Sequence, residues 1–313
     1  MKYILAICLV AASVMNAAHA QFKQAIHLVV PYGAGASTDA MARQVAPILS
    51  RELGQAVVVD NKPGANGQIG SQFVKVAPAD GSTFLFTLDH SVVVVPYITP
   101  DVPYSLKDFQ VVGKVGRFQW VFVTPLNGPA KTMSEFIDDA KRDPTLRNYG
   151  VPIVGGVPQI MGEAVERKSG VSLTPVPFAG AATLMPQLMG GQLSSGIVGV
   201  GEALSMVKSG RVRLLGISGS KRSSMLPDVP TFEELGMPGV NLGTVYIVLA
   251  PRELPNAMAE KFNAALRLAV ADANVQHEAK EMSIELESAG LAETQRELTS
   301  IADFWQHALK ATK

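Results

Sequence analysis

The chain has 313 residues, and its 27 basic and 27 acidic side chains give a formal net charge of zero. This balance excludes the basic footprint of a protein that binds nucleic acid or an anionic membrane surface. Cys8 is the only cysteine, so a chain without its first residues would have no disulfide, no Cys-ligated zinc and no Cys nucleophile.

Residues 1–20 have the pattern of a secretory signal peptide. Lys2 precedes an apolar stretch from Tyr3 to Val14, and Ala18-His19-Ala20 is a small-x-small cleavage pattern before Gln21. We expect export to the periplasm, removal of residues 1–20, and a mature chain that does not insert into the membrane, because no later segment has 18 unbroken apolar residues. A lipid anchor at Cys8 is disfavoured because bulky Ile7 precedes it and Cys8 comes too early.

Short β-rich runs and helical patterns alternate along the first part of the chain, which predicts parallel βαβ units. The run HLVVPY is followed by a predicted helix over 37–53, with an expected kink at Pro47. QAVVVDN precedes a helix near 67–77, and STFLFTL is the next strand.

A second α/β block is expected after QWVFVTP. The Thr132-x-x-Glu135 capping box predicts a helix to Arg142. The predicted elements that follow are strand NYGVPIVGG, helix 158–168, strand SLTPVPF, helix 182–189, strand SSGIVGVG, helix 202–207 and strand RVRLLGIS. Thr294-x-x-Glu297 predicts the start of a last helix, which carries Trp305 on its apolar face.

The glycine-rich turn after HLVV allows several interpretations. A dinucleotide fingerprint is weak, because Thr38 stands where the third glycine belongs and Asp60 is only a loose match to the acid that should follow. A serine nucleophile, Ser37 or Ser91, lacks a Gly-x-Ser-x-Gly elbow and an assembled triad. We therefore expect no catalytic residues. His90 has no second ligand at metal spacing, so no metal and no cofactor are expected.

An anion site agrees better with this turn, even if Ser37 is also the N-cap of the helix. A strand that ends in glycines and opens into a helix leaves several N–H groups unpaired at the positive end of the helix dipole. Such a turn binds anions. VPFAGAATLMPQL repeats the device, with Gly180 at its turn and Thr183 near the first helical turn. About four charge-assisted hydrogen bonds could together supply the about 8 kcal/mol of a micromolar dissociation constant.

Five stretches in the same order resemble the Bug family, the periplasmic solute receptors of tripartite tricarboxylate transporters. They are PYGAGASTDAMAR, NKPGANGQIG with APADGSTFLF, VPFAGAATLMPQLMGGQ, KSGRVRLLGISGSKRSSMLPDVPTFEELG and APRELP. The resemblance covers nearly the whole chain after residue 20.

The resemblance implies a type II periplasmic-binding-protein fold: two Rossmann-like lobes with a ligand cleft between them, the chain crossing twice. We place lobe 1 at 21–123 and 224–313, and lobe 2 at 124–223. The family pattern implies that a small organic acid, such as a di- or tricarboxylate, is held by Ala34, Gly35, Ser37, Thr38 and Asp39 on one wall and by Phe178, Ala179, Gly180, Ala181 and Thr183 on the other.

Some residues depart from the family pattern, which bears on the ligand. Val157 and Gln159 replace a small polar residue and a histidine, and Thr183 replaces a common proline. Asp89, beside His90, either caps nearby amides or receives an amine, amide or hydroxyl of the ligand. We include Asp89, His90 and Gln159 among the candidate ligand-binding residues.

The resemblance implies a non-enzymatic, monomeric receptor that closes around its ligand and delivers it to membrane permease subunits, with no nucleic-acid partner. Two alternatives remain open. A sensor module would bind the same ligands and pass the signal to another protein, and a hydrolase would turn its ligand over.

Overall fold

The structure, a computed structural model, describes residues 22–153, 155–178 and 180–310. The predicted signal peptide and the candidate residue Ala179 lie outside these ranges. The described chain forms two compact α/β units. Unit 1 takes the residues up to Gly116, then Tyr246–Ala279 and the part from Leu286 onward; unit 2 takes Arg117–Val245 and Lys280–Glu285.

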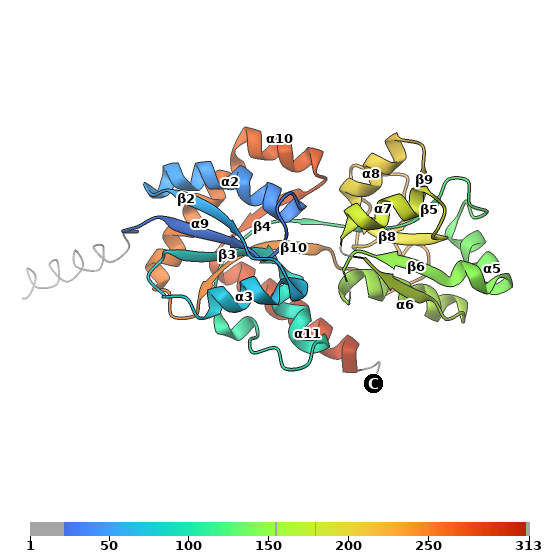
Figure 1. Cartoon of the computed structure of the whole chain (residues 1–313), viewed down its shortest axis with the longest axis horizontal. Coiled ribbons are helices and arrows are strands. Elements are labelled where there is room, and N and C mark those ends of the chain that lie inside the picture. Colours follow the sequence, from blue (N-terminus) through green and yellow to red (C-terminus); the bar gives the residue numbers. More distant parts are fainter. Residues whose placement is uncertain (1–21, 154, 179, 311–313) are drawn as a thin grey trace, which may run out of the picture. The chain divides into compact units, whose positions relative to one another are not determined.

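Unit 1 contains a six-stranded sheet in the order β11-β4-β10-β3-β1-β2 (Figure 1). β1 is parallel to both β2 and β3, as the alternating pattern predicts, and β10 runs antiparallel to β3. The strands are β1 (Ile26–Val30), β2 (Val57–Asn61), β3 (Thr83–Leu88), β4 (Phe109–Phe118), β10 (Thr244–Pro251) and β11 (Glu285–Ala289).

Helices cover this sheet and close its core. α2 (Ser37–Leu53) packs against α9 (Asn256–Ala271), and α2 continues through Pro47 as one helix. The rings of Phe84 and Phe262 stack with centroids 4.0 Å apart in the core. The other elements are α3 (Gln68–Lys75), the π-helix η2 (His90–Val94), α4 (Val95–Ile98), α10 (Ala273–Glu281) and α11 (Leu291–Lys310), with short 3₁₀ turns at Ala65–Gly67 and Leu106–Asp108.

Unit 2 contains a five-stranded sheet in the order β7-β6-β8-β5-β9. β6 is parallel to β7 and to β8, whereas β5 is antiparallel to β8 and β9. The strands are β5 (Trp120–Pro125), β6 (Asn148–Val151), β7 (Thr174–Pro177), β8 (Ser195–Gly199) and β9 (Val212–Ile217).

Four helices flank the sheet of unit 2 on its two faces (Figure 1). α7 (Ala181–Met189) packs against α8 (Val200–Lys208), and α5 (Met133–Arg142) packs against α6 (Gly156–Ser169). A 3₁₀ turn covers Pro144–Arg147. Because β6, β7 and β8 are parallel, α6, α7 and α8 all begin at the same edge of the sheet, where these strands end.

The unit boundaries differ from those expected from the sequence. The chain changes unit at Gly116/Arg117 and Val245/Tyr246 rather than near 123/124 and 223/224, and Lys280–Glu285 adds a second excursion into unit 2. The reason is strand pairing. Residues 120–123, which end the expected lobe 1, pair with β8 and β9 as the central strand β5.

Two residues expected to cap helices do not cap them. The N-cap of α2 is Ala36, so Ser37 is the first helical residue and makes no cap hydrogen bond. α11 begins at Leu291, three residues before Thr294, whose hydroxyl donates to the carbonyl oxygen of Gly290 at 2.9 Å. By contrast, the expected start of α5 is confirmed, because Thr132 is its N-cap and accepts from the Glu135 N–H.

Candidate functional site

The first part of the candidate site is the turn of unit 1 between β1 and α2. Gly33, Ala34 and Gly35 are exposed there, and Gly35 has φ 82°, a left-handed conformation that glycine adopts without strain. The first bond into α2 runs from the Ala40 N–H to the Ala36 carbonyl at 2.9 Å. The Gly35 N–H donates to Asp39 and the Ala36 N–H to the Gly33 carbonyl. The N–H groups of the first helical turn, from Ser37 to Asp39, are therefore the donors left at the positive end of the helix dipole.

Asp39 holds this turn in place. Its carboxylate accepts from the Gly35 N–H at 2.8 Å, from Arg43 Nε at 3.1 Å and from Asn61 Nδ2 at 2.9 Å. Burial alone would raise the pKa of Asp39, but these hydrogen bonds and the Arg43 charge outweigh it and lower the pKa. The Asp39 side chain is therefore a negatively charged brace of the loop.

The hydroxyl groups of Ser37 and Thr38, beside this turn, differ in how accessible they are. Ser37 Oγ is partly buried and lies 3.1 Å from the hydroxyl of Tyr246, which belongs to β10. The Thr38 side chain is buried, with 2% of its surface exposed. Within unit 1, Ser37 is thus the more accessible of the two hydroxyls that we placed at the site.

Asp89 and His90 follow β3 and start the π-helix η2. The Asp89 carboxylate accepts from the His90 N–H at 2.9 Å, which is the capping role considered from the sequence. His90 is buried and burial lowers its pKa to about 4, so the imidazole is neutral at physiological pH. π-Helical turns occur often at functional sites.

A cluster of buried polar groups surrounds this π-helix, and sequence reasoning missed it. Ser91 Oγ lies 2.7 Å from Thr87 Oγ1, and the Tyr104 hydroxyl donates to the Ser91 carbonyl at 2.9 Å. Tyr32 Oη and Ser71 Oγ are buried without a hydrogen-bond partner among the described residues. The residue types alone gave no signal, because these residues come from four separate segments of the chain that only the fold brings together.

The second part of the candidate site is the turn of unit 2 between β7 and α7. Gly180 has φ 114° and is the N-cap of α7, and the exposed Thr183 hydroxyl donates to the Gly180 carbonyl at 3.0 Å. Phe178 is partly buried and packs on the core of the unit, so its ring serves the fold at least in part. Ala181 is the first helical residue.

α6 begins at the same edge of the sheet, and its first turn carries Gln159, one of the expected contacts. Gly155 and Gly156 both have φ 74° at its start, and Gln159 in its first turn donates to Glu163 Oε1 at 2.9 Å. The Gly-Gly pair in VPIVGGVPQ was the available signal, since paired glycines before a helix indicate a turn with accessible N–H groups.

Glu202 was also missed, and it stands in the first turn of α8 at this edge. Its carboxyl folds back over Gly199. A Cβ atom at position 199 would lie 2.4 Å from Glu202 Oε2, so only glycine leaves room for this carboxyl. The signal in the sequence is an acid directly after the strand and turn SSGIVGVG.

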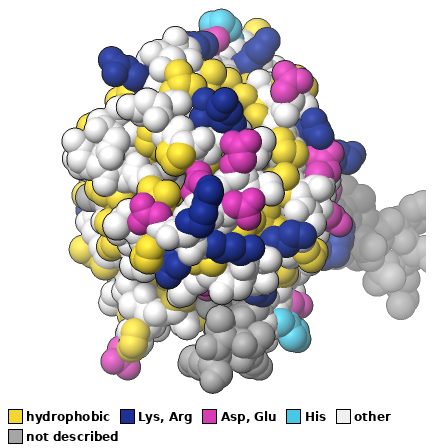
Figure 2. All heavy atoms as spheres, turned by 90° about the vertical axis from the view of Figure 1, so that its right-hand side faces the viewer, with side chains coloured by type: hydrophobic (Ala, Val, Ile, Leu, Met, Phe, Trp, Pro, Cys, Tyr) yellow, Lys and Arg dark blue, Asp and Glu magenta, His cyan; other side chains and the backbone are white. Residues whose placement is uncertain are grey.

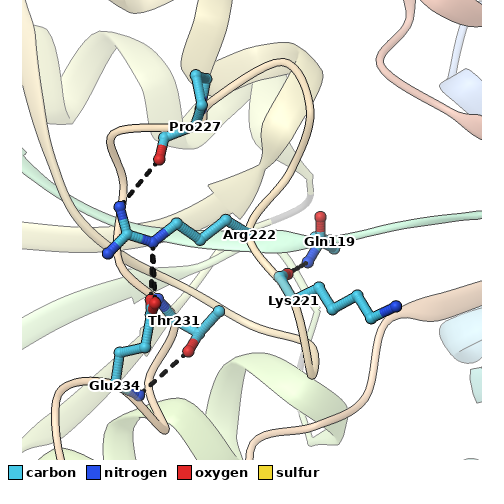
Figure 3. Close-up of polar contacts among 6 residues, drawn as sticks. All are labelled: Gln119, Lys221, Arg222, Pro227, Thr231 and Glu234. Carbon is cyan, nitrogen blue, oxygen red and sulfur yellow. Dashed lines mark hydrogen bonds and ion pairs between the residues drawn. The ribbon is translucent and has the colours of Figure 1, made fainter.

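A pocket elsewhere in unit 2 is lined by charged side chains. It is lined by Ser220, Lys221, Arg222, Thr231, Glu233 and Glu234. Arg222 Nε pairs with both carboxylate oxygens of Glu234, and Arg222 Nη1 donates to the Pro227 carbonyl at 2.9 Å (Figure 3). Gln119 holds the start of the same loop through the Lys221 carbonyl at 2.8 Å. These charges neutralise each other and organise the loop after β9.

No group of three or more His, Cys, Asp or Glu side chains among the described residues could hold a metal ion. On the face drawn in Figure 2, basic and acidic side chains are interspersed with neutral and hydrophobic surface. Within the described ranges, no helix has the length and apolar character needed to cross a bilayer.

Comparison with known proteins tests the resemblance. The family described as "Tripartite tricarboxylate transporter family receptor" matches residues 41–303. The chain belongs to this family. A UPF0065 protein of Bordetella bronchiseptica is 35% identical to the receptor over 248 residues, which cover 79% of this chain and 73% of that protein.

Solved structures agree with this membership. The periplasmic binding protein BugD is 26% identical, with a TM-score of 0.81 over 92% of this chain and 97% of BugD. An R. palustris protein solved with adipate is 26% identical, with a TM-score of 0.83 and the same coverage of the two chains. The Bug resemblance and the periplasmic-binding-protein fold are confirmed, and the family is one of solute-binding receptors rather than enzymes.

Proposed function

We propose that this receptor is exported to the periplasm, captures a small organic di- or tricarboxylate as a monomer, and delivers it to the permease subunits of a tripartite transporter. Two helix N-termini support the proposal, at the glycine turns before α2 in unit 1 and α7 in unit 2. Neither turn contains a basic residue, so main-chain N–H groups are the donors available to a carboxylate there.

The proposed contacts are the residues expected from the sequence. In unit 1 these are the turn residues Ala34 and Gly35, the Ser37 and Thr38 N–H groups, and Asp39 as the brace of the loop. In unit 2 they are the turn at Gly180 and the Ala181 N–H, with Thr183 beside them, whose hydroxyl donates to the Gly180 carbonyl. Gln159 and Phe178 stand at the same sheet edge. Asp89 and His90 are proposed as neighbours of the unit 1 contacts. The adipate bound by the R. palustris relative supports the ligand class.

Proline substitutions test the donors one at a time, because proline lacks the N–H and is well tolerated at the first position of a helix. We expect Ser37→Pro and Ala181→Pro each to raise the dissociation constant by about 10- to 100-fold, the effect of losing one charge-assisted hydrogen bond. Ser37→Ala and Ala181→Ser keep the N–H groups and are the matched controls.

The measurement is isothermal titration calorimetry with straight-chain dicarboxylates from succinate to adipate and with citrate. The residues before both proline sites have ψ values that a following proline accepts, 158° at Ala36 and 173° at Gly180. Proline variants that fold and bind as tightly as their controls would show that the donors lie elsewhere. A wild-type protein that binds no carboxylate would refute the proposed ligand class.

A further inference from the structure

Glu202 has an unusual environment for an acidic side chain. It lies in the first turn of α8, which follows β8, one strand from the turn before α6 and two strands from the turn before α7. Its carboxyl occupies the space above the backbone of Gly199. The Phe118 ring approaches the same space, within 3.5 Å of the position that a Cβ of residue 199 would take. An apolar ring and the strand end therefore border this carboxyl.

No cation compensates the carboxyl within the part of the chain that the structure describes. Burial raises the pKa of Glu202, and only its own backbone N–H acts to lower it. The other charged side chain of α8, Lys208, stands at the far end of the helix. A partly buried carboxylate without a partner is costly, which is a common property of residues that serve function rather than stability.

The position of Glu202 would let its carboxylate contact a bound ligand. α6, α7 and α8 begin at one edge of the sheet because β6, β7 and β8 are parallel, and α7 packs against α8. An acid group held by the α7 turn would place the rest of the ligand near Glu202. A ligand that carried only negative charge there would be repelled, whereas a hydroxyl or ammonium group would donate a hydrogen bond to the carboxylate.

We propose that Glu202 is a specificity-determining residue that selects acids bearing a hydrogen-bond donor, a hydroxyl or an ammonium group, over plain dicarboxylates. This inference rests on the proposed function, since it requires an acid at the α7 turn. It assigns to Glu202 the donor-reading role that the sequence analysis considered for Asp89, whose carboxylate instead caps the His90 N–H.

Succinate, malate and aspartate test the inference, because they share one carbon skeleton and carry hydrogen, hydroxyl or ammonium at the same carbon. Calorimetry on the wild-type receptor should show malate or aspartate binding at least about tenfold more tightly than succinate. Glu202→Ala should reduce this ratio to within about threefold, by weakening the donor-bearing acid.

Glu202→Gln distinguishes the two donor classes. The amide keeps an acceptor oxygen and loses the charge, so a hydroxyl ligand should retain most of its affinity and an ammonium ligand should lose it. Glu233→Ala removes an exposed acid of the same unit and is the matched control. If the receptor binds none of these acids, the same comparison is made with glutarate, 2-hydroxyglutarate and glutamate.

The outcomes separate the two proposals. An unchanged ratio in Glu202→Ala, or a wild-type preference for the plain acid, would overturn the role of Glu202 while the proline variants still decide the proposed function. Failure of every acid in both series to bind would overturn the proposed ligand class, and the role of Glu202 with it.

Discussion

At the scale of single residues, two buried polar side chains, Asp39 and His90, have different consequences for the stability of unit 1. Asp39 fixes the turn before α2 through Gly35, Arg43 and Asn61. His90 is 5% exposed, and its Nε2 has no partner among the described residues. A buried neutral imidazole makes stability depend on pH, because its protonation is possible mainly in the unfolded chain.

We predict that unit 1 loses stability between neutral pH and about pH 4.5 through His90. The folded pKa, about 4, lies below the ordinary value of 6.5, so this contribution is complete above the unfolded pKa and is lost as the pH falls toward the folded one. The loss at about pH 4.5 amounts to about 2.5 kcal/mol.

Urea unfolding of wild type and His90→Gln at about pH 7 and about pH 4.5 measures this difference. The variant should have a flatter pH dependence by that amount, whatever its absolute stability. His277→Gln, which changes an exposed histidine of α10, should keep the wild-type slope. An equally steep slope in His90→Gln would assign the acid sensitivity to other groups.

At the scale of elements, one buried ion network ties the end of the chain to unit 1. Lys114 of β4 is 2% exposed, and its Nζ lies 3.0 Å from Glu287 Oε1 of β11 and 2.7 Å from Glu297 Oε2 of α11. β4 thus meets β11 and α11, two consecutive elements near the end of the chain, at one ammonium group. Both glutamates are partly exposed, which moderates the cost of desolvating the network.

Lys114→Met should destabilise the protein by about 3 kcal/mol, because it removes the ammonium from a buried network while two carboxylates remain. The midpoint of urea unfolding should fall accordingly. Lys280→Met, a surface change on α10, should stay within about 0.5 kcal/mol of wild type. If Lys114→Met were as stable as the control, solvation of the glutamates would fully compensate for the lost pair.

The sequence predicted elements well where local signals were sufficient. α2 spans the expected 37–53, and the Thr132 capping box starts α5. Sequence-based prediction failed for the elements whose bounds depend on tertiary packing. The Thr294 pattern lies inside α11, and no local signal predicted the π-helix at His90–Val94, which packs against α3, α4 and α11.

The candidate site divides in the same way. The glycine turns before α2 and α7 could be found from the sequence, because a strand, glycines and a helix start form a local pattern. The partners of the side chains could not. Asn61, which donates a hydrogen bond to Asp39, lies 22 residues away in the sequence. The surroundings of the Glu202 carboxyl are formed by Gly199 and the Phe118 ring, which the sequence does not place together.

At the scale of the whole molecule, each unit has its own sheet and core, and the chain passes from one unit to the other four times. The described residues contain no cysteine, so no disulfide cross-links them and non-covalent contacts stabilise the fold. A ligand that binds only the folded receptor adds its binding free energy to that stability.

We therefore predict that a bound dicarboxylate raises the melting temperature and that its neutral diamide does not. At about 100 times the dissociation constant the ligand adds about 2.7 kcal/mol, which corresponds to about 5 °C for a chain of this size. Each further tenfold increase in ligand adds about 1.4 kcal/mol, so the shift should grow with the logarithm of concentration.

Thermal unfolding in the presence of adipate or adipamide makes the comparison, because the two compounds differ in charge and hardly in size. The main-chain donors of the α2 and α7 turns favour a carboxylate over an amide, since hydrogen bonds to a charged acceptor are roughly twice as strong. An equal shift with adipamide would mean that the receptor recognises shape and apolar surface. A shift with adipate alone, reduced in Ala181→Pro, would tie anion recognition to the α7 turn.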